Sequence, residues 1–200
     1  MDFFEAVMAG VKTTSSVEWL AFFTGMIYVL LAARESIWCW LFAFVSSSLF
    51  VYLCWTGQLY LESMLQLFYV AMAIVGFIAW DNRINQALKI KRWSMRVHLL
   101  NIILSAVITF ALGFLFENYT NQADPYIDAF TTVYSLTATF MVTRKVIGNW
   151  IYWMVIDVFS IYLYADRGFE LLAFQMFIFT ILAIVGFVSW NRKLNLQTDA

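Results

Sequence analysis

The chain has 200 residues, of which 63% are hydrophobic and only 12% charged, and its formal net charge is −1. Ordinary water-soluble domains are about 45–50% apolar and about 25% charged, so a soluble fold has no means of burying this much apolar surface. The charge balance also excludes a nucleic-acid-binding surface, which needs basic residues gathered on one face. Composition therefore predicts an integral membrane protein with the lipid bilayer as its partner.

Seven apolar stretches follow one another along the chain, each long enough to cross the hydrocarbon core as a helix of about 20 residues. They are 17–33, 36–56, 59–80, 97–116, 125–143, 146–166 and 168–190. Pro125 follows Asp124 where the fifth stretch begins, which is typical of a helix N-cap and first turn. Between the third and fourth stretches, residues 84–96 alternate apolar and basic side chains, so they form either an interfacial helix or a solvated basic loop.

An internal repeat appears when Arg34 is aligned with Arg144 without gaps. The sequence AIVGF at 73–77 recurs at 183–187, and a tryptophan follows each copy at Trp80 and Trp190. The repeat divides the chain into an N-terminal segment (1–16), a first three-helix unit (17–80), a basic loop with a linker helix (81–124), a second three-helix unit (125–190) and a tail (191–200).

The linker helix decides how the two units are related. Three helices reverse the direction of the chain, and a fourth restores it, so the two units enter the membrane in the same direction. Transporters with parallel repeats of this kind hold their substrate between the repeats near the middle of the bilayer. The predicted fold is therefore an all-α membrane protein with a 3+1+3 arrangement of helices, and a transporter is the first interpretation.

Basic residues gather on one side of the predicted helices. If the amino terminus and the loops after the second, fourth and sixth stretches share a side, that side holds only Lys12 and Arg167. The other side holds Arg34, Arg83, Lys89, Lys91, Arg92, Arg96, Arg144, Lys145, Arg192 and Lys193. Because short cytoplasmic loops carry the excess of Lys and Arg, we expect the amino terminus outside and the carboxyl terminus in the cytoplasm.

Asp157 is the main candidate for a functional residue within the membrane. It falls near the middle of the sixth stretch, where a carboxylate costs about 2.5–3.5 kcal/mol to insert, so it must face protein, water or a ligand. Asn149 and Trp153 share its helix face at four-residue spacing, and Trp150 lies beside them. We predict that this face points inward and contacts a substrate.

Other polar side chains lie in the third and seventh stretches. Glu62, Gln66 and Tyr69 form one stripe on the third helix, and Gln175 lies at comparable depth in the seventh. We include all four among the candidate substrate contacts. The open alternatives are that Glu62 is a carboxylate at a helix start and that the two glutamines only bond neighbouring helices.

Tryptophans divide into two predicted groups. Trp40, Trp150 and Trp153 lie inside their stretches beside polar groups, so we assign them to a binding cavity, where a flat cationic ring gains about 2 kcal/mol from a desolvated aromatic face. Trp19, Trp80 and Trp190 lie at the ends of stretches, a position typical of interfacial anchors.

Metal and cofactor sites are not predicted. Cys39 and Cys54 lie on one predicted helix about 22 Å apart at 1.5 Å per residue, and neither has a Cys or His at ligand spacing. The single histidine, His98, lies beside the basic loop.

At these same residues the sequence resembles the PnuC family of bacterial nicotinamide-riboside transporters. The resemblance rests on Asn149-Trp150 followed by Trp153 and Asp157, on ESMLQLFY at 62–69, on GFIAW at 76–80 and on the helix pattern. It implies a fold like that of the SWEET sugar transporters, although the chain lacks their proline–glutamine signature. It also implies facilitated diffusion of nicotinamide riboside (vitamin B3) across the bacterial inner membrane, trapping of the product by a cytoplasmic kinase, and a homotrimer.

Several alternatives stay open from the sequence. Within the family, the cargo is alternatively thiamine or riboflavin, and Asp157 is alternatively a proton relay in a proton-coupled carrier. A retinal receptor needs a Schiff-base lysine in its last helix, and 168–190 contains none. An intramembrane enzyme needs a nucleophile–base pair or a metal cluster, which the sequence does not supply, so no enzyme activity is expected.

Overall fold

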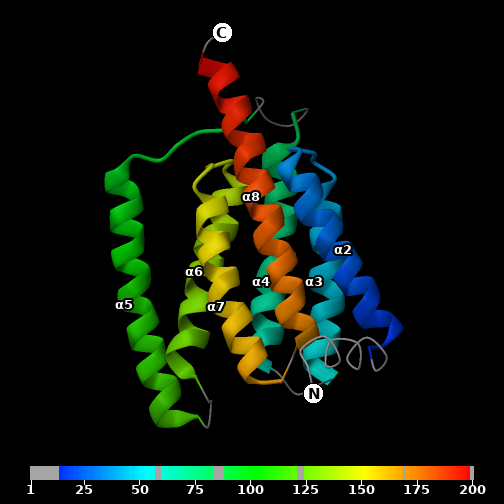
Figure 1. Cartoon of the computed structure of the whole chain (residues 1–200), viewed down its shortest axis with the longest axis vertical. Coiled ribbons are helices and arrows are strands. Elements are labelled where there is room, and N and C mark those ends of the chain that lie inside the picture. Colours follow the sequence, from blue (N-terminus) through cyan, green and yellow to red (C-terminus); the bar gives the residue numbers. More distant parts are fainter. Residues whose placement is uncertain (1–13, 57–59, 83–87, 121–123, 169, 199–200) are drawn as a thin grey trace.

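The computed structural model describes residues 14–56, 60–82, 88–120, 124–168 and 170–198. All regular elements in these ranges are α-helices, and they stand side by side (Figure 1). They are α2 (Ser16–Ala33), α3 (Cys39–Thr56), α4 (Tyr60–Trp80), α5 (Met95–Tyr119), α6 (Pro125–Thr143), α7 (Asn149–Asp166) and α8 (Glu170–Thr198). The seven helices confirm the predicted all-α fold.

One predicted boundary needs correction, and one of two open alternatives is excluded. α8 continues beyond residue 190 to Thr198, so the described part of the predicted tail is helical. The basic segment forms no helix over residues 88–94, so the interfacial helix is wrong there, and 84–87 fall outside the described residues. Instead Lys91 exchanges backbone hydrogen bonds with the α6–α7 loop, donating to the Lys145 carbonyl and accepting from Ile147, both at 3.0 Å.

Five of the helices are long and apolar enough to cross a membrane by length and composition alone, namely α2, α3, α4, α5 and α8. The other two, α6 and α7, are less apolar and each bury several polar side chains. α6 buries Ser135, Thr139 and Thr143, and α7 buries Asn149 and Asp157. Because neighbouring helices cover these groups, α6 and α7 tolerate a polar content that lipid-facing helices do not.

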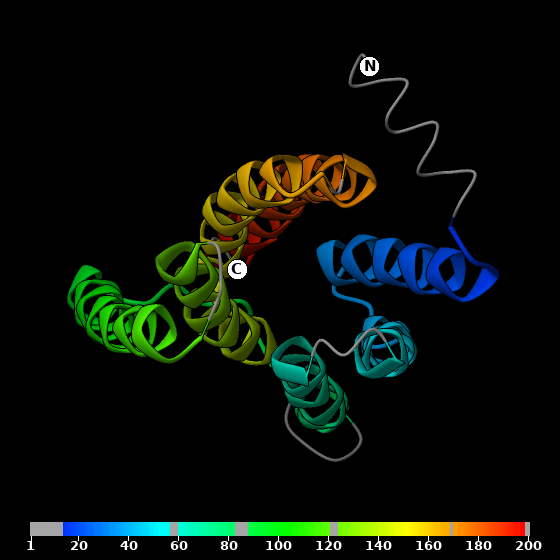
Figure 2. The ribbon, with the colours of Figure 1, turned by 90° about the horizontal axis from the view of Figure 1, so that it is seen from below.

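Six helices form a closed ring, in the order α2, α3, α4, α6, α7 and α8, with α8 returning to α2. α5 packs mainly on α6, with His98 reaching Tyr152 of α7, and lies outside the ring (Figure 2). The repeat offset superposes α2 on α6, α3 on α7 and α4 on α8, so the α2–α8 contact is the counterpart of the α6–α4 contact. α5 is therefore the linker helix that the sequence predicted.

The two ends of the ring differ in charge. The α2–α3 loop, residues 88–94, the α6–α7 loop and the C-terminal end of α8 all lie at one end, and the start of α2 lies toward the other (Figure 1). We call the first the basic end, because it collects the basic residues of these loops. The described residues show the predicted separation of charge along the bundle.

Pseudo-equivalent turns connect the helices at the basic end. Glu35 and Lys145 occupy matching positions, and both adopt the left-handed conformation, with φ of 60° and 51°. In each turn this residue donates to the carbonyl three positions earlier, Glu35 to Ala32 at 3.0 Å and Lys145 to Val142 at 2.9 Å. These are Schellman-type helix ends, and a side chain in this conformation costs about 1–2 kcal/mol.

Tryptophans pack the two halves together near the basic end. Trp40 meets Trp80 edge to face at 5.3 Å between ring centroids, and the equivalent Trp150 meets Trp190 at 5.4 Å. Trp80 and Trp190 are 6.1 Å apart across the repeats. We call these four residues the tryptophan cluster. The prediction that Trp80 and Trp190 anchor the chain at the lipid interface is wrong, because they are only 4% and 0% exposed.

Indole hydrogen bonds also cross between the repeats. Trp80 Nε1 donates to the Thr143 carbonyl at 3.2 Å, and Trp190 Nε1 donates to the Ala32 carbonyl at 3.0 Å. Each indole therefore satisfies a carbonyl near the end of a helix in the other repeat.

Gly76 and Gly186 allow this packing. A Cβ at Gly186 would lie 2.7 Å from the Trp150 ring, and a Cβ at Gly76 would overlap the Trp40 ring even more closely. We expect Gly76→Ala and Gly186→Ala each to destabilise the fold by about 1–3 kcal/mol, the usual cost of overpacking. The measurement is the thermal unfolding temperature of the purified protein in detergent. Ala71→Val, which enlarges an exposed residue of α4, is the matched control and should leave it unchanged.

Candidate functional site

α7 directs its polar face into the ring. Asn149 is fully buried and Asp157 is 3% exposed, while Trp153 is partly buried and packs against the hydrophobic core. Ser160, 7% exposed, extends the same face by one further turn. A carboxylate, an indole and an amide thus follow one another along the inner side of this helix.

Tyr69 brings α4 and α6 to this face. Its side chain lies beside Ser135 of α6 and within electrostatic range of Asp157 and Tyr164 of α7. Tyr28 of α2 is in turn within electrostatic range of Tyr69. Tyr69 therefore lies near the carboxylate of Asp157 and near three other hydroxyl groups, and groups of this kind hold ligand hydroxyls and amides.

Gln175 lies at the opposite corner of the ring, where α2 meets α8. It is 2% exposed, and its Nε2 lies 4.0 Å from the position of a Cβ on Gly25. The same position lies 3.2 Å from Ser46 Oγ and 3.6 Å from Phe179. Gln175 is therefore packed among α2 and α3 and is separate from the Tyr69 corner.

The two corners are pseudo-equivalent but chemically different. The repeat offset superposes Gly25 on Ser135 and Phe179 on Tyr69, so one corner has a glycine and a phenyl ring where the other has two hydroxyls. It likewise superposes the buried Ser47 on Asp157. The ring has a nearly symmetric backbone with one acidic, hydroxyl-rich side.

Two candidates from α4 are only partly buried. Glu62 lies within electrostatic range of Tyr164, toward the end of the ring opposite the basic end. Gln66, one turn further along α4, is also partly buried. Both are less enclosed than Asp157 and Asn149.

Three indole and amide groups near the basic end are buried without hydrogen-bond partners among the described residues. They are Trp40 Nε1, Trp150 Nε1 and Asn149 Oδ1, although Asn149 Nδ2 donates to the Val146 carbonyl at 2.7 Å. A buried polar group without a partner costs about 1–3 kcal/mol, so these atoms favour a polar ligand beside them. The structure also gives Trp40 and Trp150 a packing role, as members of the tryptophan cluster.

An ion pair joins α6 and α7 at the other end. Arg167 donates two hydrogen bonds to Asp128, at 3.2 and 2.6 Å, and lies 3.9 Å from Asp124. Paired guanidinium–carboxylate geometry of this kind is strong and directional. It links the start of α6 to the end of α7.

Sequence reasoning missed Tyr28, Ser47, Ser135 and Tyr164. The repeat offset was sufficient to find Ser47, because it superposes that residue on Asp157. The other three gave no signal, since tyrosine and serine are common in apolar helices and only the packing of the ring brings them together. No group of three His, Cys, Asp or Glu that suits a metal ion occurs among the described residues.

Residues 15–192 match the model of the nicotinamide mononucleotide transporter family. The chain belongs to this family. Its fold also matches a solved structure titled "Crystal structure of the Vitamin B3 transporter PnuC", with a TM-score of 0.76, 24% identity, and coverage of 96% of this chain and 88% of that chain.

Curated relatives differ in their cargo. The nicotinamide riboside transporter PnuC of Escherichia coli is 27% identical, and the match covers 95% of this chain and 94% of the relative. That of Neisseria mucosa is 26% identical, with coverage of 94% and 78%. The riboflavin/roseoflavin transporter RibM of Streptomyces davaonensis is also 26% identical, with coverage of 83% and 80%. Family membership alone therefore leaves several flat heterocycles as cargo.

Proposed function

We propose that this protein carries nicotinamide riboside across the bacterial cytoplasmic membrane by facilitated diffusion. The observation that carries the proposal is Asp157, a buried carboxylate midway along a helix of the ring, with Trp153 and Asn149 on the same face. The pyridinium of the riboside is a flat cation, so it suits both an acid and an indole face. Its carboxamide and ribose suit the amides and hydroxyls around that acid.

Charge favours the riboside over two related ligands. In the described part of the chain, every Lys and Arg lies in a loop or near a helix end, so the phosphate of a mononucleotide would lack a partner beside Asp157. The neutral flavin ring of riboflavin would leave that carboxylate without a cation. A buried charge without a partner is costly, so a cationic nucleoside is the best match.

The driving force follows from the same positive charge. An inside-negative membrane favours entry of one cation by about 2.3 kcal/mol per 100 mV. Phosphorylation by a cytoplasmic kinase would then trap the product, and the protein itself needs no catalytic groups. The excess of basic residues at one end supports a cytoplasmic carboxyl terminus and an external amino terminus.

A homotrimer is part of the proposal. α5 packs mainly on α6, and much of its remaining surface is apolar and exposed, including Leu100, Val107 and Phe110 at 65%, 63% and 68%. In a membrane this face meets either lipid or another copy. We propose that part of this face meets lipid and part meets another copy. The six helices of the ring close on one another without α5, so α5 is available for assembly.

Removing the acid should weaken binding. For Asp157→Asn we expect the affinity for nicotinamide riboside to fall about 10- to 100-fold, because a hydrogen bond to a charged group contributes about 1.5–3 kcal/mol. For Trp153→Ala we expect a fall of at least about fivefold from the lost aromatic face. Calorimetry on the purified protein measures both.

The matched control is Asp166→Asn, an exposed carboxylate on the same helix, which should bind normally. Nicotinamide mononucleotide, thiamine and riboflavin are titrated in parallel. Tighter binding of any of these than of the riboside would contradict the proposed cargo, and normal binding by both site variants would remove Asp157 and Trp153 from the site.

Uptake should follow membrane potential and not the pH gradient. In proteoliposomes, an inside-negative potential of 100 mV should raise the accumulation of riboside about 50-fold, the equivalent of about 2.3 kcal/mol. A pH gradient imposed at zero potential should change nothing. Uptake that responds to the pH gradient would instead favour the proton-coupled alternative, with Asp157 as the relay.

A further inference from the structure

A cleft opens at the basic end of the ring. It has a volume of about 400 Å³ and is lined by Glu35, Trp80, Asp81 and Lys145, among others. That volume lies within the range of small-ligand sites, which is about 300–1,000 Å³. The cleft is distinct from the Asp157 region, because its lining comes from the ends of helices and the turns between them.

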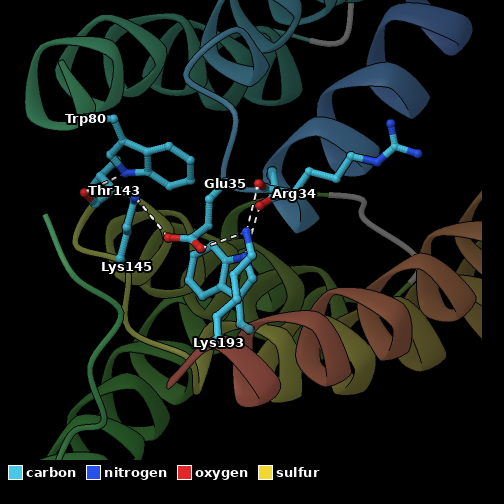
Figure 3. Close-up of polar contacts among 8 residues, drawn as sticks. Arg34, Glu35, Trp80, Thr143, Lys145 and Lys193 are labelled. Atoms are coloured by element: carbon cyan, nitrogen blue, oxygen red, sulfur yellow. Dashed lines mark hydrogen bonds and ion pairs between the residues drawn. The ribbon is translucent and has the colours of Figure 1, made fainter. Parts of the chain in front are cut away.

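Lys145 lies between an acid and an aromatic ring in this cleft. Its Nζ is 3.0 Å from Glu35 Oε2 and 4.6 Å from the centroid of the Trp80 ring (Figure 3). The Lys145 and Glu35 side chains are only 12% and 14% exposed. The other Glu35 oxygen binds Lys193 at 3.0 Å. A cation on an aromatic face, beside a carboxylate and largely shielded from water, is a complete cation site.

We propose that this cleft is a second binding site, for a flat organic cation, in which the ligand replaces the Lys145 ammonium on Trp80 and Glu35. The inference rests on the proposed function for its ligand class, because a transported pyridinium has the same two requirements as the ammonium. The cleft would then be the last site that binds the substrate before its release into the cytoplasm.

Differences between the repeats support a site on one side only. Glu35 and Lys145 are pseudo-equivalent, and so are Asp81 and Asn191. In the equivalent arrangement at the other turn, Glu35 would take the place of Lys145, and Trp190 the place of Trp80. A carboxylate is repelled by the negative face of an aromatic ring. The duplication has therefore kept the backbone of both turns, while the lysine at one of them lies on Trp80 and the glutamate at the other cannot play that part at Trp190.

The tryptophan cluster connects the cleft with the interior of the ring. Trp80 contacts Trp40 and Trp190, and Trp190 contacts Trp150, which lies one turn from Trp153 on α7. Aromatic groups therefore extend from the Asp157 face to the cleft. A ligand that displaces Lys145 also removes one of the two ion pairs that hold Glu35, so its arrival would loosen the contact between the repeats.

The test uses Lys145→Met, which keeps the alkyl chain and removes the tethered cation. It is made in the Asp157→Asn protein, so that binding at the interior site is weakened, and 1-methylnicotinamide is the probe. We expect the affinity for this cation to rise at least about fivefold over Asp157→Asn alone, because the ring face and one carboxylate oxygen lose their occupant. Adding Glu35→Gln should abolish the gain.

Lys193→Met is the matched control, because it also removes a cation from Glu35 but not one above Trp80. It should not raise the affinity, and uncharged nicotinamide should not bind more tightly to any variant. No gain with Lys145→Met, or a gain that survives Glu35→Gln, would overturn the second site. Lys145→Gln serves the same purpose if the methionine variant does not fold.

A second measurement needs no substitution. In the unaltered protein, saturating nicotinamide riboside should increase the modification of Lys145 by an amine-reactive reagent, while modification of Lys193 changes less, as measured by mass spectrometry. Unchanged modification of Lys145 would contradict its displacement. The calorimetric comparison of the unaltered protein with Asp157→Asn tests the proposed function separately. The interior site and the second site can therefore fail independently.

Discussion

Packing of tryptophan against glycine within each repeat is the contact on which the rest of this structure depends, because it places the indoles that bridge the two repeats. Trp40 fits only because Gly76 has no side chain, and Trp150 only because Gly186 has none. The neighbouring indoles of Trp80 and Trp190 then bond backbone carbonyls of the opposite repeat. In a bilayer, close packing and hydrogen bonds replace the hydrophobic effect as the force between helices. The contact between Trp80 and Trp190 and their two hydrogen bonds therefore hold the two halves in one register.

The symmetry of that frame makes its exceptions informative. Where the offset superposes Ser47 on Asp157, one half carries a carboxylate in the middle of the membrane and the other only a hydroxyl. Where it superposes Glu35 on Lys145, the two turns carry opposite charges that pair at 3.0 Å. A duplicated scaffold supplies two similar faces, and divergence at a few positions gives the ring one acidic, hydroxyl-rich side.

The interior site and the cleft share one kind of recognition. Asp157 with Trp153, and Glu35 with Trp80, each combine an acid with an indole. In the proposed path, a cation that leaves the first pair meets the second on its way to the basic end. If two sites each bind the ligand with moderate affinity, neither holds it too tightly to release it. Passage through a carrier requires such release.

The sequence by itself determined the seven helices, their order and the repeat, because span length and apolar content follow from the thickness of the bilayer. It also singled out Asp157, since an acid in an apolar helix stands out without any structure. Only the tertiary structure decided that Trp80 and Trp190 are buried and that residues 88–94 form no helix. It alone brought Tyr28, Ser135 and Tyr164 to the Asp157 region and Lys145 onto Trp80. These outcomes depend on which helices become neighbours, and the local pattern of side chains carries no record of that.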